Sequence, residues 1–134
     1  MRLQKKALED LQGKVDLTIC IYHGGFESDL ETGKRLSGTT ENIGYKICTE
    51  LGFDVLLTGH QHMPVAGRMV NGTYTLQPLA NGREYAYVEI DLEKEAFSSG
   101  NATYPATITS INSKKFSQTL IMQRNCVRVQ FCGG

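Results

Sequence analysis

The chain contains three histidines, and each of them follows a short apolar segment. His23 comes directly after residues 15–22, whereas His60 and His62 come just beyond residues 54–58. Both segments have the nearly continuous apolar character of buried parallel strands. Side chains two residues apart in extended backbone point the same way, so His60 and His62 are predicted to share a face. Because ligands bind beyond the carboxyl ends of parallel strands, the three imidazoles predict a metal or phosphate site there.

Imidazole nitrogens predict a site for zinc, manganese, iron, cobalt or nickel. By count, three histidines could form a mononuclear zinc site with one position open to water. A two-metal site also needs bridging oxygen ligands, but Asp16 and Asp54 stand at the starts of their strands, at the far edge of the sheet. Glu27 and Asp29 follow His23 in a loop, where we expect solvated surface side chains. The sequence therefore indicates half of a two-metal site.

Phosphate binding by other means has less support in the sequence. There is no phosphate loop of the G-x-x-x-x-G-K-[ST] type and no G-x-S-x-G elbow. Gly24 and Gly25 could offer backbone amides to a phosphate oxygen. Arg68 and Arg83 follow the last two histidines, and we expect each of them to form a surface salt bridge.

The expected elements place the first two histidines at the same edge of a parallel sheet. Apolar residues at helical spacing predict a helix over residues 3–11, and a strand over 15–22 follows it. A second helix, capped by Thr39 or Thr40, precedes a strand over 54–58. The apolar stripe of this second helix consists of Ile43, Ile47, Cys48 and Leu51. A right-handed crossover between the two strands brings their carboxyl ends together.

Antiparallel pairing is expected in the rest of the chain. Asn71-Gly72 lies between apolar segments 66–70 and 73–77 and predicts a β-hairpin. Alternating apolar residues predict a strand over 84–92, after a turn at Asn81-Gly82. Further strands are expected over 107–111 and 127–131, beyond a loop at 97–105. The predicted fold class is α/β, with a parallel βαβ unit followed by antiparallel hairpin strands.

The composition is that of one globular domain or a piece of one. Of 134 residues, 40% are hydrophobic and 21% charged, and the net charge is zero, which excludes the basic field of a nucleic-acid-binding protein. No apolar run reaches the roughly 20 residues that span a bilayer. Residues 1–10 lack the apolar core of a secretion signal, so the chain taken alone has a cytoplasmic character. The four cysteines form no C-x-x-C pair, although Cys126 and Cys132 could join in a disulfide under oxidising conditions.

The motifs around the three histidines resemble those of a known family. The motifs are His23-Gly24-Gly25-Phe26-Glu27, then Glu41-Asn42 ahead of a helix, then Gly59-His60-Gln61-His62. They are similar to the later half of the calcineurin-like metallophosphoesterase domain, in the branch of 5′-nucleotidases and 2′,3′-cyclic-nucleotide 2′-phosphodiesterases. The resemblance covers residues 1–95 and implies a partial metallophosphoesterase sandwich, with residues 96–134 as a tail to which no structure is assigned.

This resemblance implies two divalent metal ions, such as zinc, manganese or iron, in the complete domain. His23 and His60 would bind one ion and His62 the other, and Asn42 matches a substrate-binding position. The implied reaction is hydrolysis of a nucleotide phosphate ester by a metal-held hydroxide that attacks phosphorus in line. The family also implies an extracellular, cell-wall or periplasmic location.

Three earlier motifs of the family are absent from this sequence: Asp-x-His, Gly-Asp with the bridging aspartate, and Gly-Asn-His-[Asp/Glu]. We therefore expect a fragment that alone binds at most one metal ion weakly, has no catalytic residue of its own beyond the metal ligands, and is inactive. Its incomplete sheet is expected to expose an edge through which chains could associate. Two alternatives stay open: a non-catalytic remnant or binding module, and a mononuclear three-histidine zinc hydrolase.

Overall fold

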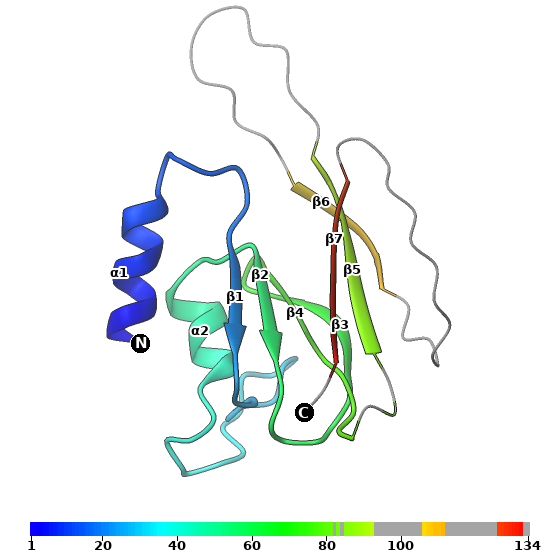
Figure 1. Cartoon of the computed structure of the whole chain (residues 1–134). Coiled ribbons are helices and arrows are strands. Elements are labelled where there is room, and N and C mark those ends of the chain that lie inside the picture. The colour runs from blue at the N-terminus through cyan, green and yellow to red at the C-terminus, as the bar shows by residue number, and fades with distance from the viewer. Residues whose placement is uncertain (82, 84, 93–105, 112–125, 133–134) are drawn as a thin grey trace, which may run out of the picture.

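The computed structural model describes residues 1–81, 83, 85–92, 106–111 and 126–132 of the chain. Two helices and seven strands follow one another in these residues (Figure 1): α1 (Arg2–Leu11), β1 (Ile19–Tyr22), α2 (Gly44–Glu50), β2 (Val55–Thr58), β3 (Val65–Val70), β4 (Thr73–Gln77), β5 (Tyr85–Leu92), β6 (Ala106–Ile111) and β7 (Cys126–Cys132). The expected loop at 97–105 lies outside the described residues.

The strands form two sheets. The first has the order β1-β2-β4-β3, in which β1, β2 and β4 are parallel and β3 is antiparallel to β4. The second has the order β6-β5-β7 and is antiparallel. The predicted α/β class and parallel βαβ unit are confirmed. The hairpin β3–β4 is antiparallel as predicted. Its second strand, β4, lies beside β2 and is parallel to it, so β4 extends the parallel part of the first sheet and β3 is the outermost strand on that side.

Helix α2 and the second sheet cover opposite faces of the first sheet (Figure 1). Strand β2 shows this in its alternation: Leu56 packs with the core beneath α2, whereas Val55 and Leu57 pack with the apolar residues of β5. All four residues of β2 are buried. Burying an aliphatic side chain of this size contributes about 1.5–3 kcal/mol. The strand that leads to His60 is therefore held on both faces.

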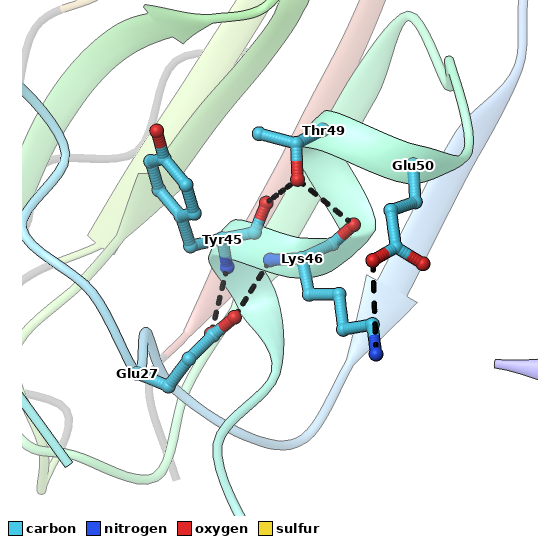
Figure 2. Close-up of polar contacts among 5 residues, drawn as sticks. All are labelled: Glu27, Tyr45, Lys46, Thr49 and Glu50. Carbon is cyan, nitrogen blue, oxygen red and sulfur yellow. Dashed lines mark hydrogen bonds and ion pairs between the residues drawn. The ribbon is translucent and has the colours of Figure 1, made fainter. Parts of the chain in front are cut away.

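Helix α2 begins beyond Thr39 and Thr40, so the expected threonine cap is wrong. The carboxylate of Glu27 caps the helix instead, because it accepts hydrogen bonds from the backbone N–H groups of Tyr45 and Lys46 at 3.1 and 2.9 Å (Figure 2). These are among the N–H groups that a helix start leaves without an internal partner. Glu27 is buried, so its expected role as a solvated loop residue is also wrong.

The predicted apolar stripe is confirmed for Ile47, Cys48 and Leu51, whereas Ile43 precedes α2 and packs, partly buried, against the same core. Ile47 and Cys48 are fully buried and Leu51 is nearly so, in the core between α2 and the first sheet. The outer side of the helix is polar: Lys46 Nζ lies 3.6 Å from Glu50 Oε1, and both side chains are about half exposed (Figure 2). The helix thus has one face toward the sheet and one toward solvent, as its 3.6-residue period requires.

Strand β1 starts later than residue 15, because the residues before it are largely exposed. Its amino end is tied to that of β2: Asp54 Oδ2 accepts hydrogen bonds from the N–H and the hydroxyl of Thr18, at 2.7 and 2.6 Å. Asp54 therefore lies at the edge of the sheet opposite to His23, as predicted. In the described part of the chain β1 is an outermost strand, and its Ile21 is 78% exposed. Association through this edge stays a prediction.

The expected first helix is confirmed as α1, which packs only at its margin. None of its residues is buried, although Met1 and Leu8 touch the core beneath α2. Neither described helix is long and apolar enough to cross a membrane.

The two late strands, β6 and β7, are also confirmed, and both pair with β5. Cys126 and Cys132 are the first and last residues of β7. Six steps of extended backbone separate their Cα atoms by about 20 Å, whereas a disulfide allows about 7 Å. The strand conformation therefore excludes a bond between these two cysteines within one chain.

Candidate metal site at the carboxyl edge of the sheet

The carboxyl ends of β1 and β2 bring His23 and His60 together. The two strands are parallel and in register, with Tyr22 opposite Thr58, so they end at the same level. The two imidazole ring centroids are 5.4 Å apart and the ring planes meet at 72°, an edge-to-face arrangement. The prediction that His23 and His60 lie at the same edge is confirmed.

Each of these two histidines is the central residue of a three-residue turn. A backbone hydrogen bond of 3.0 Å closes the turn around His23, and another of 3.0 Å closes the turn around His60. His60 has a φ of 77°, in the left-handed region that residues other than glycine rarely adopt. Such backbone strain costs about 1–3 kcal/mol and gathers at functional sites. The surrounding contacts must therefore hold His60 in place.

His62 also lies in the left-handed region, with a φ of 58°. Because β2 ends at Thr58 and both later histidines lie in turns, the alternation of an extended strand does not apply to them. The argument that His60 and His62 share a face by alternation is therefore wrong. His62 is exposed to solvent.

Glu41 orients the imidazole of His60. Glu41 Oε1 lies 2.8 Å from His60 Nε2. When the ring is neutral, Nε2–H donates to this carboxylate and Nδ1 keeps its lone pair, which is the arrangement common around metal-ligating histidines. The hydroxyl of Tyr22 donates to the backbone carbonyl of Glu41 at 2.5 Å and so anchors Glu41 beside β1. Burial raises the pKa of Tyr22, so this hydroxyl keeps its proton.

The two glycines after His23 use their amides inside the protein. Gly24 N–H donates to a backbone carbonyl at 3.0 Å, and Gly25 N–H donates to Asn42 Oδ1 at 2.7 Å. The expectation that these amides are available to a phosphate oxygen is therefore wrong. Asn42 is buried, and its amide oxygen holds the loop that follows His23. A substrate contact of Asn42 stays a prediction.

Gln61, between the two later histidines, is a site residue that sequence reasoning missed. Its Oε1 accepts from the N–H of Phe26 at 2.8 Å, and its Nε2 donates to the carbonyl of Phe26 at 2.9 Å. This paired contact joins the turn after β2 to the loop after β1. No local pattern could have revealed it, because the partners are 35 residues apart in the chain.

The described side chains offer two adjacent candidate metal ligands. His23 and His60 are adjacent imidazoles, and imidazole suits zinc and related ions. Within the part of the chain that the structure describes, no group of three or more His, Cys, Asp or Glu side chains is placed to hold a metal ion. These residues thus fit two ligands of one ion, and they do not form the three-histidine site of a mononuclear zinc hydrolase.

Among the described contacts, Asp29 and Arg68 pair with residues other than the histidines. Asp29 Oδ1 accepts hydrogen bonds from the hydroxyl and the N–H of Thr32, both at 2.7 Å, which lowers the pKa of Asp29. Arg68 pairs with Glu31 on the surface, so the predicted surface salt bridge of Arg68 is confirmed. Arg83 is exposed, and its salt bridge stays a prediction.

A hollow of about 360 Å³ lies at the opposite edge of the sheet, between α1 and the starts of β1 and β2. Thr18 and Asp54 are among its lining residues. Because these residues precede the strands whose ends carry the histidines, the hollow is separate from the histidine edge.

Comparison with known proteins gives a solved structure whose fold is similar to that of this chain. No protein-family model matches the chain, and no curated protein matches it. The crystal structure of a putative 5′-nucleotidase from Staphylococcus aureus, in complex with alpha-ketoglutarate, superposes with a TM-score of 0.66 at 25% sequence identity. The match covers 92% of this chain and 23% of the Staphylococcus aureus chain. The α/β architecture is therefore that of part of a phosphoesterase-like fold.

Proposed function

We propose that this chain is part of a metal-dependent phosphoesterase that hydrolyses nucleotide phosphate esters, of the 5′-nucleotidase or 2′,3′-cyclic phosphodiesterase type. In this proposal residues 1–95 are the carboxyl-terminal half of its catalytic domain, and the protein acts outside the cytoplasm. The observation that carries the proposal is the edge-to-face pair of His23 and His60 at the ends of adjacent parallel strands. The likeness to the Staphylococcus aureus structure supports it.

In this proposal His23 and His60 hold one divalent ion and His62 contributes to a second. The remaining donors come from polypeptide other than the described residues, since those residues provide no third ligand beside the pair. Divalent ions in such a site neutralise charge on the phosphoryl oxygens and lower the pKa of water. His60 would bind through Nδ1, because its Nε2 faces Glu41.

The chain's own contribution is to fix these imidazoles before a ligand arrives. Glu41 sets the tautomer of His60, and the turns at the ends of β1 and β2 set the ring directions. Asn42 uses its Oδ1 on the N–H of Gly25, so a contact to a nucleotide would use its Nδ2–H₂ group. A preorganised set of ligands loses less entropy when an ion or substrate binds.

A non-catalytic binding module is a second candidate for the chain by itself. The observation in its favour is that the described residues bring together two imidazoles but no third metal ligand. A two-imidazole site binds metal without the bridging oxygens that a pair of ions requires. Both candidates predict that the isolated chain does not turn over bis(p-nitrophenyl) phosphate in the presence of Mn²⁺.

A chimaera separates the two candidates. The matched segment of the Staphylococcus aureus protein is replaced by this chain, and hydrolysis of bis(p-nitrophenyl) phosphate and of nucleoside 5′-monophosphates is measured with Mn²⁺ or Zn²⁺. The phosphoesterase proposal expects turnover and bound metal, both lost in the His23→Ala and His60→Ala chimaeras. Glu31→Ala, at an exposed residue paired with Arg68, is the matched control and should leave both unchanged. A folded chimaera without turnover, or one in which His60→Ala changes neither quantity, would refute the proposal.

A further inference from the structure

We infer that Gln61 is a positioning residue: its side-chain amide sets the approach of His60 to His23. The inference rests on the proposed function for its biological meaning, since a fixed pair of imidazoles matters only where they act together. The geometry on which it stands is independent of that function. It concerns how two segments, 35 residues apart, are held at one edge of the sheet.

The amide of Gln61 binds the backbone of Phe26 at both polar groups. Oε1 accepts from the N–H at 2.8 Å and Nε2 donates to the carbonyl at 2.9 Å, in the way that a neighbouring strand would. Phe26 itself is buried in the core beneath α2. The amide therefore fastens the turn that carries His60 to a fixed point of the core.

Other contacts of the loop after β1 join it to different parts of the protein. Asn42 and Glu27 join the loop to the start of α2, and neither touches the turn after β2. Besides the 2.8 Å contact of Glu41 Oε1 with Nε2 of His60 itself, the backbone hydrogen bond of 3.2 Å from Gly59 N–H to the Gly24 carbonyl is a further polar link between the loop and the turn among the described residues. That link precedes His60 in the chain, whereas the contact of Gln61 follows it. The strained φ of His60 is thus held from both sides.

Gly25 provides the space that the amide occupies. A Cβ atom at residue 25 would lie 2.1 Å from both Cδ and Oε1 of Gln61 and 2.2 Å from its Cγ. These atoms are the far end of a flexible side chain, so Gly25→Ala displaces the amide and leaves the packed core in place. The two substitutions Gln61→Ala and Gly25→Ala therefore remove the same contact by different means.

The test is the nuclear Overhauser cross-peak between the ring protons of His23 and His60, recorded on the full chain. We expect a strong cross-peak in the wild type and its loss in Gln61→Ala and in Gly25→Ala. In thermal unfolding, Gly25→Ala should lower the Tm no further in the Gln61→Ala background, because the two substitutions remove the same contact and their effects are then not additive. The matched controls are Gln12→Ala, at an exposed residue of α1's end, and Gly38→Ala, where a Cβ meets nothing within 4 Å. Both controls should keep the cross-peak.

Thermal unfolding of each variant shows whether the fold survives. A cross-peak of wild-type strength in Gln61→Ala would overturn the inference, and so would an additive effect of the two substitutions. If Gln61→Ala fails to fold, the cross-peak of Gly25→Ala still tests the inference, since this variant keeps the glutamine. The result is independent of the proposed function: a folded chimaera without turnover would refute that function, and the cross-peak would still report on Gln61.

Discussion

Replacing Glu27 by alanine is expected to destabilise the protein through the start of α2. The substitution removes the acceptor of two backbone hydrogen bonds, from Tyr45 N–H at 3.1 Å and from Lys46 N–H at 2.9 Å (Figure 2). Glu27 is 8% exposed, so water replaces the lost carboxylate poorly. The loop that Glu27 leaves is the one that begins with His23, and the substitution therefore acts on the candidate site as well as on the helix.

The size of the effect follows from these contacts. A net hydrogen bond to a charged group contributes about 1.5–3 kcal/mol, and loss of a helix cap typically costs about 1 kcal/mol. Since the two bonds share one carboxylate and are not independent, we expect Glu27→Ala to lower the free energy of unfolding by about 3 kcal/mol. Glu27→Gln keeps one acceptor oxygen and turns an NH₂ group toward the other N–H, so about half of this loss is expected.

Urea unfolding followed by far-ultraviolet circular dichroism measures these differences. For a chain of this length, 3 kcal/mol corresponds to a fall in Tm of about 12 °C, which a thermal scan should show in parallel. Glu31→Ala is the matched control, because Glu31 is an exposed carboxylate that pairs with Arg68 on the surface, and a loss of at most about 1 kcal/mol is expected. Equal losses for Glu27→Ala and Glu31→Ala would refute the reasoning.

Three further predictions follow from burial and hydrogen bonding. Ile47→Ala should lower the free energy of unfolding in urea by about 2–5 kcal/mol, since a fully buried side chain leaves a cavity; a loss below that range would contradict the packing beneath α2. Burial raises the pKa of Cys48 to about 12, so iodoacetamide at pH 8 should label it more slowly than Cys20, as peptide mass mapping would show, and faster labelling of Cys48 would contradict this. Hydrogen bonds from Thr32 lower the pKa of Asp29 below its ordinary 3.8, so this carboxylate stabilises the fold above pH 3.8 and stops doing so as the pH falls through the lowered value. A carbon-13 titration should show that midpoint and its rise in Thr32→Val, and a wild-type midpoint at or above 3.8 would count against the contact.

Local patterns predicted the elements that depend on neighbouring residues. The apolar stripe of α2 and the buried strand β2 follow from periodicity. The hairpin follows from Asn71 and Gly72, whose φ values of 48° and 81° are both positive, as a tight two-residue turn requires. The meeting of His23 and His60 also follows, because a right-handed crossover leaves few arrangements for two parallel strands.

Contacts between distant residues could not be predicted in this way. The cap from Glu27 joins residues 18 and 19 positions apart, and the amide of Gln61 joins residues 35 apart. The pairing of strands in the second sheet could not be predicted for the same reason, since β5 pairs with strands that begin at Ala106 and Cys126. Strand alternation did not predict where the side chains of His60 and His62 lie, because both residues adopt a left-handed backbone that only surrounding contacts can impose.

The central claim is that His23 and His60 act on one ion together. Its most direct test is a Zn²⁺ titration of the chain in which the ring nitrogen-15 shifts of all three histidines are followed. We predict that Nδ1 of His60 and one ring nitrogen of His23 shift together with a single affinity, while His62 does not follow them. Separate affinities for His23 and His60, or no shift of either, would contradict the account.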